Sequence, residues 1–400
     1  MIQTSLQQFI ADHRNDDVRQ LALDASRYPD VDMRSALVQI SGWQKACEKL
    51  PSWASAEGIV YPEKLSLEQC SSEATANYKL ELSRRLCADR HERIADLTGG
   101  LAVDGSTLAR HFNHYLYIDS QKQLCEIARH NLPLLGIHDF EVCQGSCEDF
   151  ISSLPHQDMI FIDPARRDEA GRKVVGLKDC TPDITQLLDG LLERCDYLMV
   201  KLSPMIDIRS AVDQLRQVVE VHVVAVDGEC KEVLLVVQGN GSKDDIAIRV
   251  YALNIKSHGA NELFTFFPAD EQSSSFLLAD RLGEYLFEPN SAVMKAGGYK
   301  SLAHSYQVCQ LDANTHLYTS DQLIDGFPGR KFIVVDSTSF SKKSLKSFLA
   351  GMTQCNLAVR NFPSSVAELR KRLNVRDGGS DYLFATTMKG ERLLIRCKKA

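Results

Sequence analysis

Short apolar runs alternate with longer amphipathic segments between residues 93 and 238, and this pattern constrains the fold more than any other feature of the chain. Runs that are rich in β-branched or aromatic residues and separated by helix-sized gaps are typical of parallel strands buried on both faces. The predicted strands are Ile94–Leu97, Tyr115–Ile118, Glu141–Gln144, Met159–Ile162, Tyr197–Leu202, Val219–Val226 and Val233–Val237. The sequence therefore predicts an α/β fold with a doubly wound, mostly parallel, seven-stranded sheet.

The last two predicted strands are joined by a much shorter segment, which begins with Asp227-Gly228. Parallel neighbours need a crossover of about a dozen residues or more, so this gap permits only an antiparallel hairpin. We therefore expect a parallel sheet that is closed by one antiparallel hairpin.

The chain outside this sheet is predicted to form three further regions. Residues 1–88 carry apolar side chains at helical spacing, which predicts an N-terminal helical region. Gly239–Asp245 is rich in glycine and polar residues and predicts a linker that ends the sheet domain, residues 89–245. After the linker, the pattern predicts two small α+β domains over residues 246–328 and 329–400.

The first of these small domains has a distinct predicted order of elements. Two strand-like runs, Ile246–Leu253 and Leu263–Phe267, precede a helix-like stretch over Ser274–Glu284. We therefore expect the two strands to belong to the small domain together with the helix.

Charge is distributed unevenly along the chain. Residues 330–400 contain 15 Lys and Arg against 5 Asp and Glu, a net charge of +10, whereas the rest has 31 against 48, a net charge of −17. A basic end on an acidic chain indicates a polyanionic partner, although a merely solvated surface is the alternative. The predicted phosphate-binding residues are Lys342, Lys343, Lys346, Arg370, Lys371 and Arg372.

The position of these basic residues on predicted helices favours a role in binding. Arg370–Arg372 end a helix, where positive charge is favourable in any case. Lys342 and Lys343 begin another helix, where a cation is mildly unfavourable. Helix stability therefore does not explain these two lysines, and contact with phosphate does.

Several features of the sequence bear on compartment and metal binding. No stretch approaches the roughly 18 apolar residues that a membrane span needs, and the N-terminus shows no secretory signal. The 12 cysteines form no C-x-x-C pair, which is typical of reduced thiols in the cytoplasm. His111 and His114 form a lone H-x-x-H without a cysteine pair nearby. We expect a cytoplasmic protein that binds neither a membrane nor a metal.

The ends of the first two predicted strands carry a nucleoside-binding pattern. The first strand leads into Asp96–Gly100, and a glycine-rich turn lets the backbone approach a ligand and presents free N–H groups. The second strand ends at Asp119, where an acid can accept hydrogen bonds from ribose hydroxyls. The G-x-G-x-x-G fingerprint is absent, which disfavours an NAD-dependent enzyme. The two strand ends together predict a nucleoside ligand at the carboxyl edge of the sheet.

The clearest chemical signal follows the fourth strand, in the segment Asp163–Arg167. Asp163 offers a hydrogen-bond acceptor or a base, and Pro164 leaves neighbouring carbonyls free to face a substrate. Arg166 and Arg167 have the fork geometry that grips phosphate. The alternative is a strand-ending turn with solvated arginines. Lys201 ends the fifth strand and is a weaker catalytic candidate, because lysines there often extend to solvent.

At these residues the sequence resembles the class I S-adenosylmethionine-dependent methyltransferases. The loop Asp96–Gly105 is similar to their motif I, Asp119 to their ribose-binding acid, and Asp163-Pro164 to their motif IV. The resemblance is closer still to one family of methyltransferases, which carries a ferredoxin-like domain and a C-terminal THUMP-like domain. Traits of that family appear in Gln69–Lys79, Asp163–Arg167, Lys201–Pro204, Glu288–Asn290, Lys295–Gly297 and Phe327–Arg330.

This resemblance implies the ligands. The implied methyl donor is S-adenosylmethionine, and the implied substrate is a structured RNA such as tRNA or rRNA rather than DNA. The residues implied to bind the donor are Asp96, Thr98, Gly99, Gly100, Asp119, Ser120, Gly145 and Ser146. The residues implied to act in catalysis are Asp163, Pro164, Arg166, Arg167 and Lys201.

Two departures from the family pattern bear on the chemistry. Ser146 follows the third strand, where many relatives have an acid near the adenine amino group. The Asp-Pro-Ala-Arg form resembles the motif of pyrimidine C5 methyltransferases, but those enzymes need a cysteine nucleophile at the end of strand five. Ser203 stands there, and Cys195 precedes the strand. We therefore expect direct in-line transfer to a base nitrogen.

Two alternatives stay open at this point. Ser146 and the lack of an Asn-Pro-Pro-Tyr motif are compatible with an RNA-binding protein that retains the fold without turnover. A methyltransferase that acts on a protein or a small molecule is the other alternative. The basic C-terminal end argues against it, because a small substrate needs no basic surface.

Overall fold

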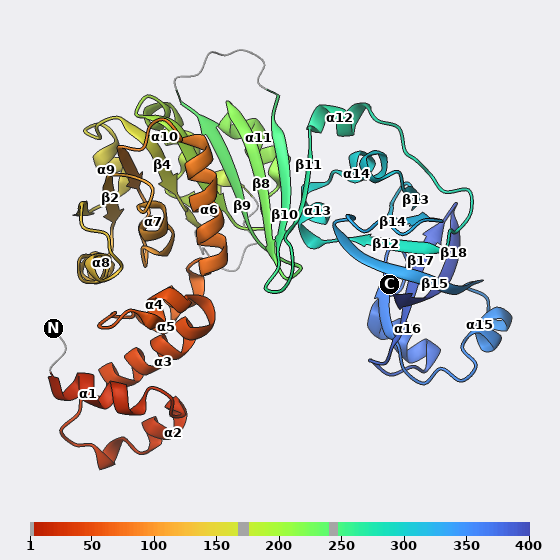
Figure 1. Cartoon of the computed structure of the whole chain (residues 1–400), viewed down its shortest axis with the longest axis horizontal. Helices are drawn as coiled ribbons and strands as arrows, with labels where there is room; N and C mark the ends of the chain where they lie inside the picture. The colour runs from red at the N-terminus through yellow and green to blue at the C-terminus, as the bar shows by residue number, and fades with distance from the viewer. Residues whose placement is uncertain (1–3, 167–175, 240–246) are drawn as a thin grey trace. The chain divides into compact units, whose positions relative to one another are not determined.

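The computed structural model divides into two compact units (Figure 1). Unit 1 comprises Met1–Val219 and Val233–Ile246, and unit 2 comprises Glu220–Glu232 and Ala247–Ala400. The structure describes residues 4–166, 176–239 and 247–400. Apart from Gly239, the predicted linker lies outside the described residues.

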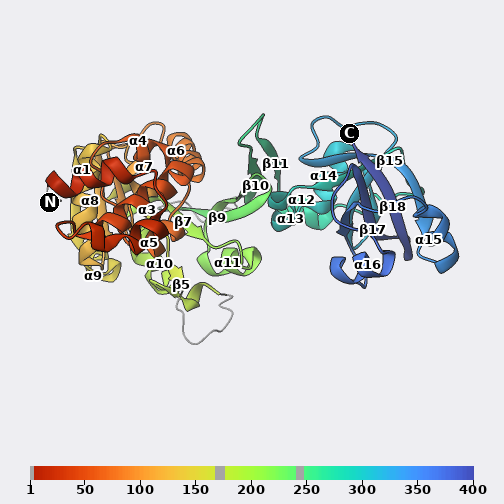
Figure 2. The ribbon, with the colours of Figure 1, turned by 90° about the horizontal axis from the view of Figure 1, so that it is seen from below.

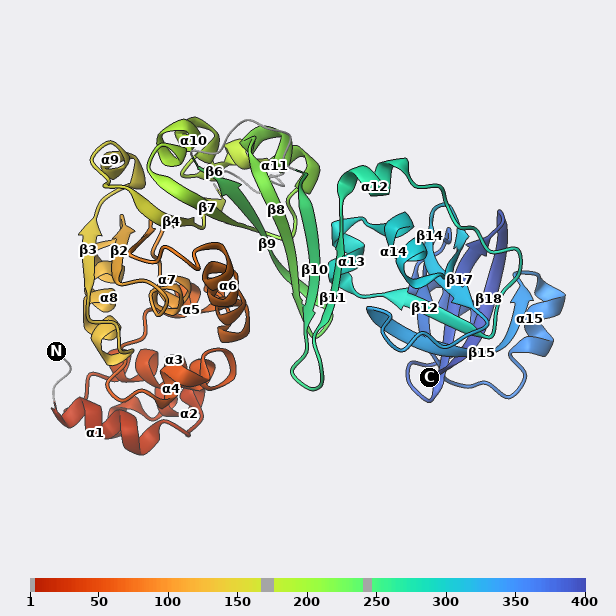
Figure 3. The ribbon, with the colours of Figure 1, turned by 45° about the horizontal axis from the view of Figure 1, so that its top comes forward.

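The sheet of unit 1 contains the predicted parallel strands (Figure 3). Its strands are β1 Arg93–Asp96, β2 His114–Asp119, β3 Phe140–Gln144, β4 Gln157–Ile162, β7 Cys195–Leu202 and β9 Glu229–Gln238, in the order β9-β7-β4-β1-β2-β3. β3, β2, β1, β4 and β7 pair in parallel, and β9 pairs antiparallel with β7. The predicted doubly wound, mostly parallel α/β fold is confirmed.

Helices connect these strands, as a parallel sheet requires. They are α7 Val103–Leu108, α8 Lys122–Leu134, α9 Cys147–Ile151, α10 Ile184–Leu192 and α11 Ile208–Leu215. Two short strands, β5 Ala165–Arg166 and β6 Cys180–Thr181, and the 3-10 turn η2 Leu177–Asp179 lie between β4 and α10. All six residues of β4 are buried, as expected of a central strand covered on both faces.

The predicted hairpin is formed by β8, Val218–Val226, and by β9. Asp227 and Gly228 join them with φ angles of 47° and 85°, the left-handed conformation that a tight hairpin turn requires. In unit 2, β10 Arg249–Ile255 pairs in parallel with β8, and β11 Glu262–Phe266 pairs with β10. The sequence predicts these last two strands in a small separate domain and a sheet of seven strands. Instead they extend the described sheet to nine strands, because pairing with β8 covers an edge that would otherwise be exposed.

The N-terminal part of unit 1 is helical, as predicted. Its helices are α1 Thr4–His13, α2 Val18–Leu23, α3 Met33–Lys49, α4 Pro51–Ser55, α5 Lys64–Gln69 and α6 Glu73–Leu86, with a 3-10 turn η1 Ala25–Arg27. Polar side chains cap several of their starts: Asp17, Asp32 and Ser72 accept hydrogen bonds from backbone N–H groups of the first turn. Ser72 thereby sets the first residue of α6.

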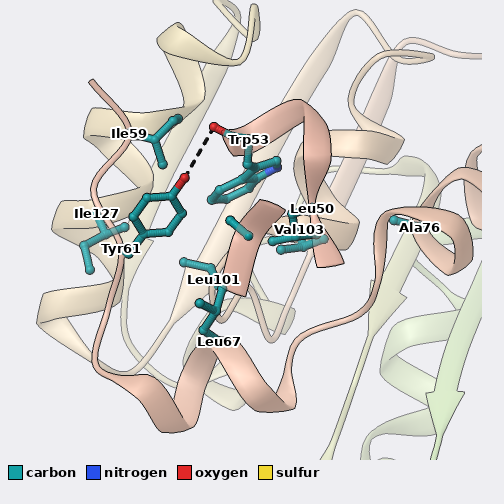
Figure 4. Close-up of a cluster of buried hydrophobic side chains, with 10 residues drawn as sticks. Leu50, Trp53, Ile59, Tyr61, Leu67, Ala76, Leu101, Val103 and Ile127 are labelled. Atoms are coloured by element: carbon teal, nitrogen blue, oxygen red, sulfur yellow. Dashed lines mark hydrogen bonds between the residues drawn. The ribbon is translucent and has the colours of Figure 1, made fainter. Parts of the chain in front are cut away.

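One hydrophobic core joins α3, α4, α5 and α6 to the segment after β1 and to α8 (Figure 4). Trp53 and Tyr61 lie in it, and the Tyr61 hydroxyl donates to the Trp53 carbonyl oxygen at 3.4 Å. Leu101 and Val103 follow β1 and pack in the same core, together with Ile127 of α8. The shared core therefore holds the N-terminal helices against the loop that follows the first strand.

A second sheet forms the rest of unit 2 (Figure 2). Its strands are β12 Tyr285–Pro289, β13 Cys309–Asp312, β14 Thr315–Ser320, β15 Gly329–Ser339, β16 Asn356–Val359, β17 Asp381–Met388 and β18 Glu391–Lys399, in the order β13-β14-β12-β15-β18-β17-β16. Its helices are α12 Pro268–Ser273, α13 Ser291–Ala296, α14 Tyr299–Tyr306, α15 Lys342–Phe348 and α16 Val366–Leu373. Because β12 pairs with β15, the two predicted α+β regions share one sheet.

The predicted helix over Ser274–Glu284 is not present, and the segment is extended or irregular instead. The Gln310 N–H donates to the Leu277 carbonyl oxygen at 2.7 Å, and the Ala279 N–H donates to the Gln310 carbonyl oxygen at 2.9 Å. Pairing with β13 thus overrides the helical spacing of the apolar residues. None of the described helices has the length and apolar character needed to cross a membrane.

Candidate active site

A cleft opens at the carboxyl edge of the sheet in unit 1, beside the ends of β1, β2, β3, β4 and β7. Its volume of about 350 Å³ is suited to a small ligand. The predicted site residues that line the cleft are Asp96, Thr98, Gly99, Gly100, Asp119, Ser120, Gly145, Ser146, Asp163 and Lys201. Parallel strands bring these residues together because their carboxyl ends meet at one edge of the sheet.

Gly99 and Gly100 form the turn after β1. A Cβ atom at Gly99 would lie 2.1 Å from a ring carbon of Tyr117, so only glycine fits there. Gly100 has a φ of 53°, in the left-handed region that favours glycine. The Tyr117 hydroxyl donates to the Gly100 carbonyl oxygen at 2.7 Å and fixes the turn. The backbone of the turn is therefore held at the cleft without side chains in the way.

Asp119 ends β2 and connects that strand to the glycine turn. Its Oδ2 accepts a hydrogen bond from the Gly100 N–H at 2.9 Å, and its Oδ1 accepts one from the Gln121 N–H at 2.7 Å. These two bonds orient the carboxylate, and each oxygen keeps capacity for a further donor. Asp119 is therefore placed to accept hydrogen bonds from the hydroxyls of a ligand in the cleft.

Ser146 stands at the start of α9. It contacts Asp149, an acid that the sequence analysis did not name. The Ser146 hydroxyl donates to Asp149 Oδ2 at 2.8 Å, and the Ser146 N–H donates to the same oxygen at 3.2 Å. Glu148 also lines the cleft. Carboxylates are thus present just after β3, although the residue after Gly145 is a serine. The S-x-x-D spacing of a capping box was the available signal.

Asp96 is the most deeply buried carboxyl group of the cleft, with 1% of its surface exposed. Its Oδ1 accepts a hydrogen bond from the Thr98 N–H at 3.1 Å. Burial, together with the smaller effect of the negative charges of Asp104 and Asp163, raises the pKa of Asp96 to about 8. A cation in the cleft would favour the ionised form of this group.

Asp163 directly follows β4 and faces the cleft. Its N–H donates to Thr98 Oγ1 at 2.7 Å, which ties the motif after β4 to the turn after β1. Its side chain is 37% exposed, and its carboxylate contacts the ammonium group of Lys201. Asp163 is therefore the accessible end of an ion pair whose cation is largely buried.

The other residues of this predicted motif are placed differently. Pro164 is buried and is not among the described residues that line the cleft. The side chain of Arg166 and all of Arg167 lie outside the described residues. The phosphate-binding role of the two arginines stays a prediction.

Besides Asp163, a group of buried side chains contacts the Lys201 ammonium. This buried lysine network consists of Ser71, Lys79, Asp104 and Lys201. Lys201 Nζ lies 3.1 Å from Asp104 Oδ2 and donates to Ser71 Oγ at 3.1 Å. Lys79 Nζ lies 3.1 Å from Asp104 Oδ1, and the Ser71 hydroxyl donates to Asp104 Oδ2 at 2.6 Å.

The electrostatics of the network follow from its burial. The side chain of Lys79 is 0% exposed, that of Asp104 8% and that of Lys201 11%. Burial alone would raise the pKa of Asp104, but the charges of Lys201 and Lys79 outweigh it and lower the pKa to about 2. Asp104 is therefore ionised at neutral pH.

Sequence reasoning missed Ser71, Lys79 and Asp104 as site residues. Ser71 and Lys79 lie in the family-like segment Gln69–Lys79, which was noted without a role. Lys79 also shares a buried face of α6 with apolar residues. A lysine on an apolar helix face was the signal that pointed to a buried ion pair.

The predicted phosphate-binding residues lie on two helices of unit 2 that pack into one core. Lys342, Lys343 and Lys346 are exposed on α15, behind the cap residue Ser341. The last turn of α16 carries the other three, Arg370, Lys371 and Arg372. Of these, Lys371 and Arg372 are exposed, whereas Arg370 pairs with Asp377 at 2.5 Å. Five of the six are therefore fully at the surface.

His111 and His114 have separate partners. His111 Nε2 lies 3.2 Å from the Cys87 carbonyl oxygen, and His114 Nδ1 lies 2.6 Å from Asp139 Oδ1. Among the described residues, no group of three or more His, Cys, Asp or Glu side chains is arranged to hold a metal ion.

Comparisons with known proteins match the C-terminal part of the chain to two family models and the whole chain to a solved structure. Residues 285–328 match a family model of a ferredoxin-like domain, and residues 329–399 match a THUMP domain-like model. A solved structure from Porphyromonas gingivalis W83, described as a candidate methyltransferase, is 33% identical. It aligns with a TM-score of 0.87 over 99% of this chain and 98% of that one.

Curated relatives match a shorter stretch. An uncharacterized S-adenosylmethionine-dependent methyltransferase of Mycobacterium tuberculosis, found in two strains, is 26% identical over 257 residues. The match covers 62% of this chain and 64% of the length of that relative.

Proposed function

Because the chain belongs to the S-adenosylmethionine-dependent methyltransferases that carry ferredoxin-like and THUMP-like domains, we propose that it methylates a base nitrogen in tRNA or rRNA. S-adenosylmethionine is the cofactor of this family. The observation that carries the proposal is the cleft, which combines a glycine turn, a ribose-type acid and an accessible Asp163.

The residues of the cleft fit S-adenosylmethionine. A Cβ atom would fill the space at Gly99, and the Asp119 carboxylate stands oriented at the neighbouring strand end. Asp119 and Ser120 would hold the ribose hydroxyls, while Gly145 and Ser146 would lie against the adenine. Asp96 would sit near the positive charge of the donor, which offsets the cost of ionising a buried carboxyl group.

The chain supplies orientation and a proton acceptor, while the sulfonium of the bound donor supplies an electrophilic methyl group. Asp163 would hold the N–H of the acceptor nitrogen in line with that methyl group. When the nitrogen gains the methyl group, its proton passes to the Asp163 carboxylate and then to solvent. The carboxylate of Asp163 has the exposure that such a contact needs.

The thiols of unit 1 support a nitrogen acceptor over a pyrimidine C5 mechanism. Cys195 is fully buried, its thiol donates to the Leu191 carbonyl oxygen, and burial raises its pKa to about 12. Cys70 and Cys147 line the cleft, but burial raises the pKa of both thiols above the ordinary value. A thiolate nucleophile is therefore disfavoured at each of these positions.

The choice of RNA as substrate rests on unit 2. Its THUMP-like part carries the exposed lysines of α15 and the basic end of α16. A surface of this charge suits phosphate backbones, which position a substrate without selecting its sequence. Base selection would then fall to the cleft.

The test is to measure S-adenosylhomocysteine formation with purified fractions of tRNA, rRNA, protein and small metabolites. We expect formation with one of the RNA fractions and a methylated base nitrogen in its nucleosides by mass spectrometry. Formation with the protein or metabolite fraction alone would contradict the RNA assignment. No formation with any fraction, despite measurable binding of S-adenosylmethionine, would favour an RNA-binding protein without turnover.

A further inference from the structure

The buried lysine network places two ammonium groups beside one carboxylate, and one of these ammonium groups also contacts Asp163. Lys79 and Lys201 bring two positive charges, and Asp104 brings one negative charge. A single buried positive charge is costly unless an anion meets it. Asp163 is the anion that contacts the Lys201 ammonium, and it is the partner that faces the cleft.

We propose that the buried lysine network positions the Asp163 carboxylate for methyl transfer, acting through the Lys201 ammonium. The inference rests on the proposed function, in which Asp163 accepts the proton of the methylated nitrogen. Lys201 is held by Asp104 and by Ser71, so its ammonium meets Asp163 in one orientation. Ser71, Lys79 and Asp104 are therefore positioning residues, and none of them is required to touch the substrate.

The network also gives the N-terminal helices a part in the reaction. Ser71 precedes the cap of α6, Lys79 lies within that helix, and Asp104 begins α7. α6 packs against α7, so the geometry of Lys201 depends on the packing of two helices from different parts of the sequence. An Asp163 carboxylate without this support would swing between rotamers, and a shift of about 1 Å at a reacting group can cost about 100-fold in rate.

A double variant separates positioning from a purely structural role. Asp104→Asn alone leaves two buried lysines without the anion of the network, so it loses stability as well as activity. Asp104→Asn combined with Lys79→Met keeps the pair of Lys201 with Asp163 and restores the charge balance. Positioning predicts that the double variant regains its melting temperature while the rate of methyl transfer to total RNA stays about 100-fold below wild type. A double variant that folds and turns over at the wild-type rate overturns the inference.

A milder variant keeps the test decisive where the double variant does not fold. Ser71→Ala removes the hydrogen bonds of the Ser71 hydroxyl with Lys201, Asp104 and Lys79, and it removes no charged group. We expect the rate to fall about tenfold, as for the loss of a bond to a charged group, while calorimetry shows unchanged affinity for S-adenosylmethionine. Glu81→Gln is the matched control, because Glu81 lies on the same helix in an exposed pair with Arg84, and it should change neither quantity.

A measurement without turnover distinguishes this inference from the proposed function. Acetic anhydride acylates a lysine faster when its ammonium is less firmly paired, and peptide mass spectrometry reads the rate at each lysine. We expect Lys201 to react about tenfold faster in Ser71→Ala than in wild type, which corresponds to about 1.4 kcal/mol of lost pairing. Equal rates would overturn the network even if the wild type is an active methyltransferase. Faster labelling in an inactive wild type would retain the network and remove the proposed function.

Discussion

Asp96 and Asp104 stand at the two ends of the same loop, both are buried, and their pKa values move in opposite directions. Burial, with a smaller effect of neighbouring carboxylates, raises the pKa of Asp96 to about 8. Burial also acts on Asp104, but two lysines reverse it and lower the pKa to about 2. On the proposed function, Asp96 and Asp119 form the donor half of the cleft, and Asp104 and Asp163 form its acceptor half.

The difference between the halves indicates how one cleft can bind a cationic methyl donor and an uncharged base. In the donor half, Asp96 is protonated below a pH of about 8, and a cationic donor would favour its ionised form. In the acceptor half, lysines of the protein already balance the carboxylates. An uncharged base can then approach Asp163 without a net electrostatic penalty. Variants of the two halves should therefore fail in different measurements.

Asp163→Ala tests the acceptor half and should have the largest effect. Loss of a positioned proton acceptor should lower the rate of methyl transfer by about 10²–10⁴-fold. Affinity for S-adenosylmethionine, measured by calorimetry, should stay at the wild-type value because the donor half is intact. Cys195→Ser is the control and should remain active, since no thiol adduct is proposed. Normal turnover by Asp163→Ala would remove Asp163 from the mechanism.

Asp119→Ala tests the donor half and should show the reverse pattern. The variant loses the carboxylate that orients the Gly100 N–H and receives the ligand hydroxyls. Affinity for S-adenosylmethionine should fall by about 1.5–3 kcal/mol, as for the loss of a charged hydrogen-bond partner. At saturating donor, the rate of transfer should return toward the wild-type value. Unchanged affinity in calorimetry would remove Asp119 from the donor site.

The pH dependence of donor binding should separate Asp96 from Asp104. Asp96 is protonated below a pH of about 8, and a cationic donor binds better to the ionised carboxylate. Affinity should therefore rise with pH up to about 8 and weaken by up to about 1.4 kcal/mol for each unit below it. Asp104, with a pKa of about 2, contributes no change in this window.

Asp96→Asn provides the control for this dependence, because it removes the titrating carboxyl group and keeps its shape. The difference between the two titrations isolates Asp96 from groups of the donor that titrate in the same window. Identical pH dependence in wild type and variant would show that Asp96 does not face the donor charge.

The donor half could be predicted from the sequence more completely than the acceptor half. Apolar runs set the ends of the strands, and parallel pairing brings those ends to one edge, so Asp96, Asp119 and Asp163 could be placed together. Ser71 and Lys79 precede the first strand, and their contacts with Asp104 depend on how α6 packs against α7. Such packing is a long-range property that local spacing does not encode.

The same limit explains the errors in unit 2. The apolar residues of Ser274–Glu284 have helical spacing, yet the backbone there bonds to β13. The runs Ile246–Leu253 and Leu263–Phe267 are predicted to belong to the small domain, yet β10 pairs with β8 and β11 pairs with β10. Each error arose where pairing between distant segments decided the structure, because sequence patterns report a segment's own preference and not its partner.

Variants of the predicted RNA-binding residues should have the smallest effect. They should lower the affinity for RNA and leave the affinity for S-adenosylmethionine unchanged. Deletion of residues 330–400 would remove four strands from the shared sheet of unit 2, so substitutions are the sharper test. In the triple variant Lys342→Ala, Lys343→Ala, Lys346→Ala, fewer phosphates are neutralised, so RNA affinity should fall. The salt dependence of log affinity should become shallower by about 0.7–0.9 for each phosphate that the variant no longer neutralises.

Donor affinity separates this effect from damage to the fold, because the variant should bind S-adenosylmethionine as wild type does. Arg27→Ala combined with Lys45→Ala is the control, since these residues are exposed basic groups of unit 1. The control should leave the salt slope of RNA binding unchanged if unit 2 alone tracks the phosphates. If the two variants shift the slope equally, RNA binding follows the total charge of the chain, and α15 carries no dedicated surface for RNA.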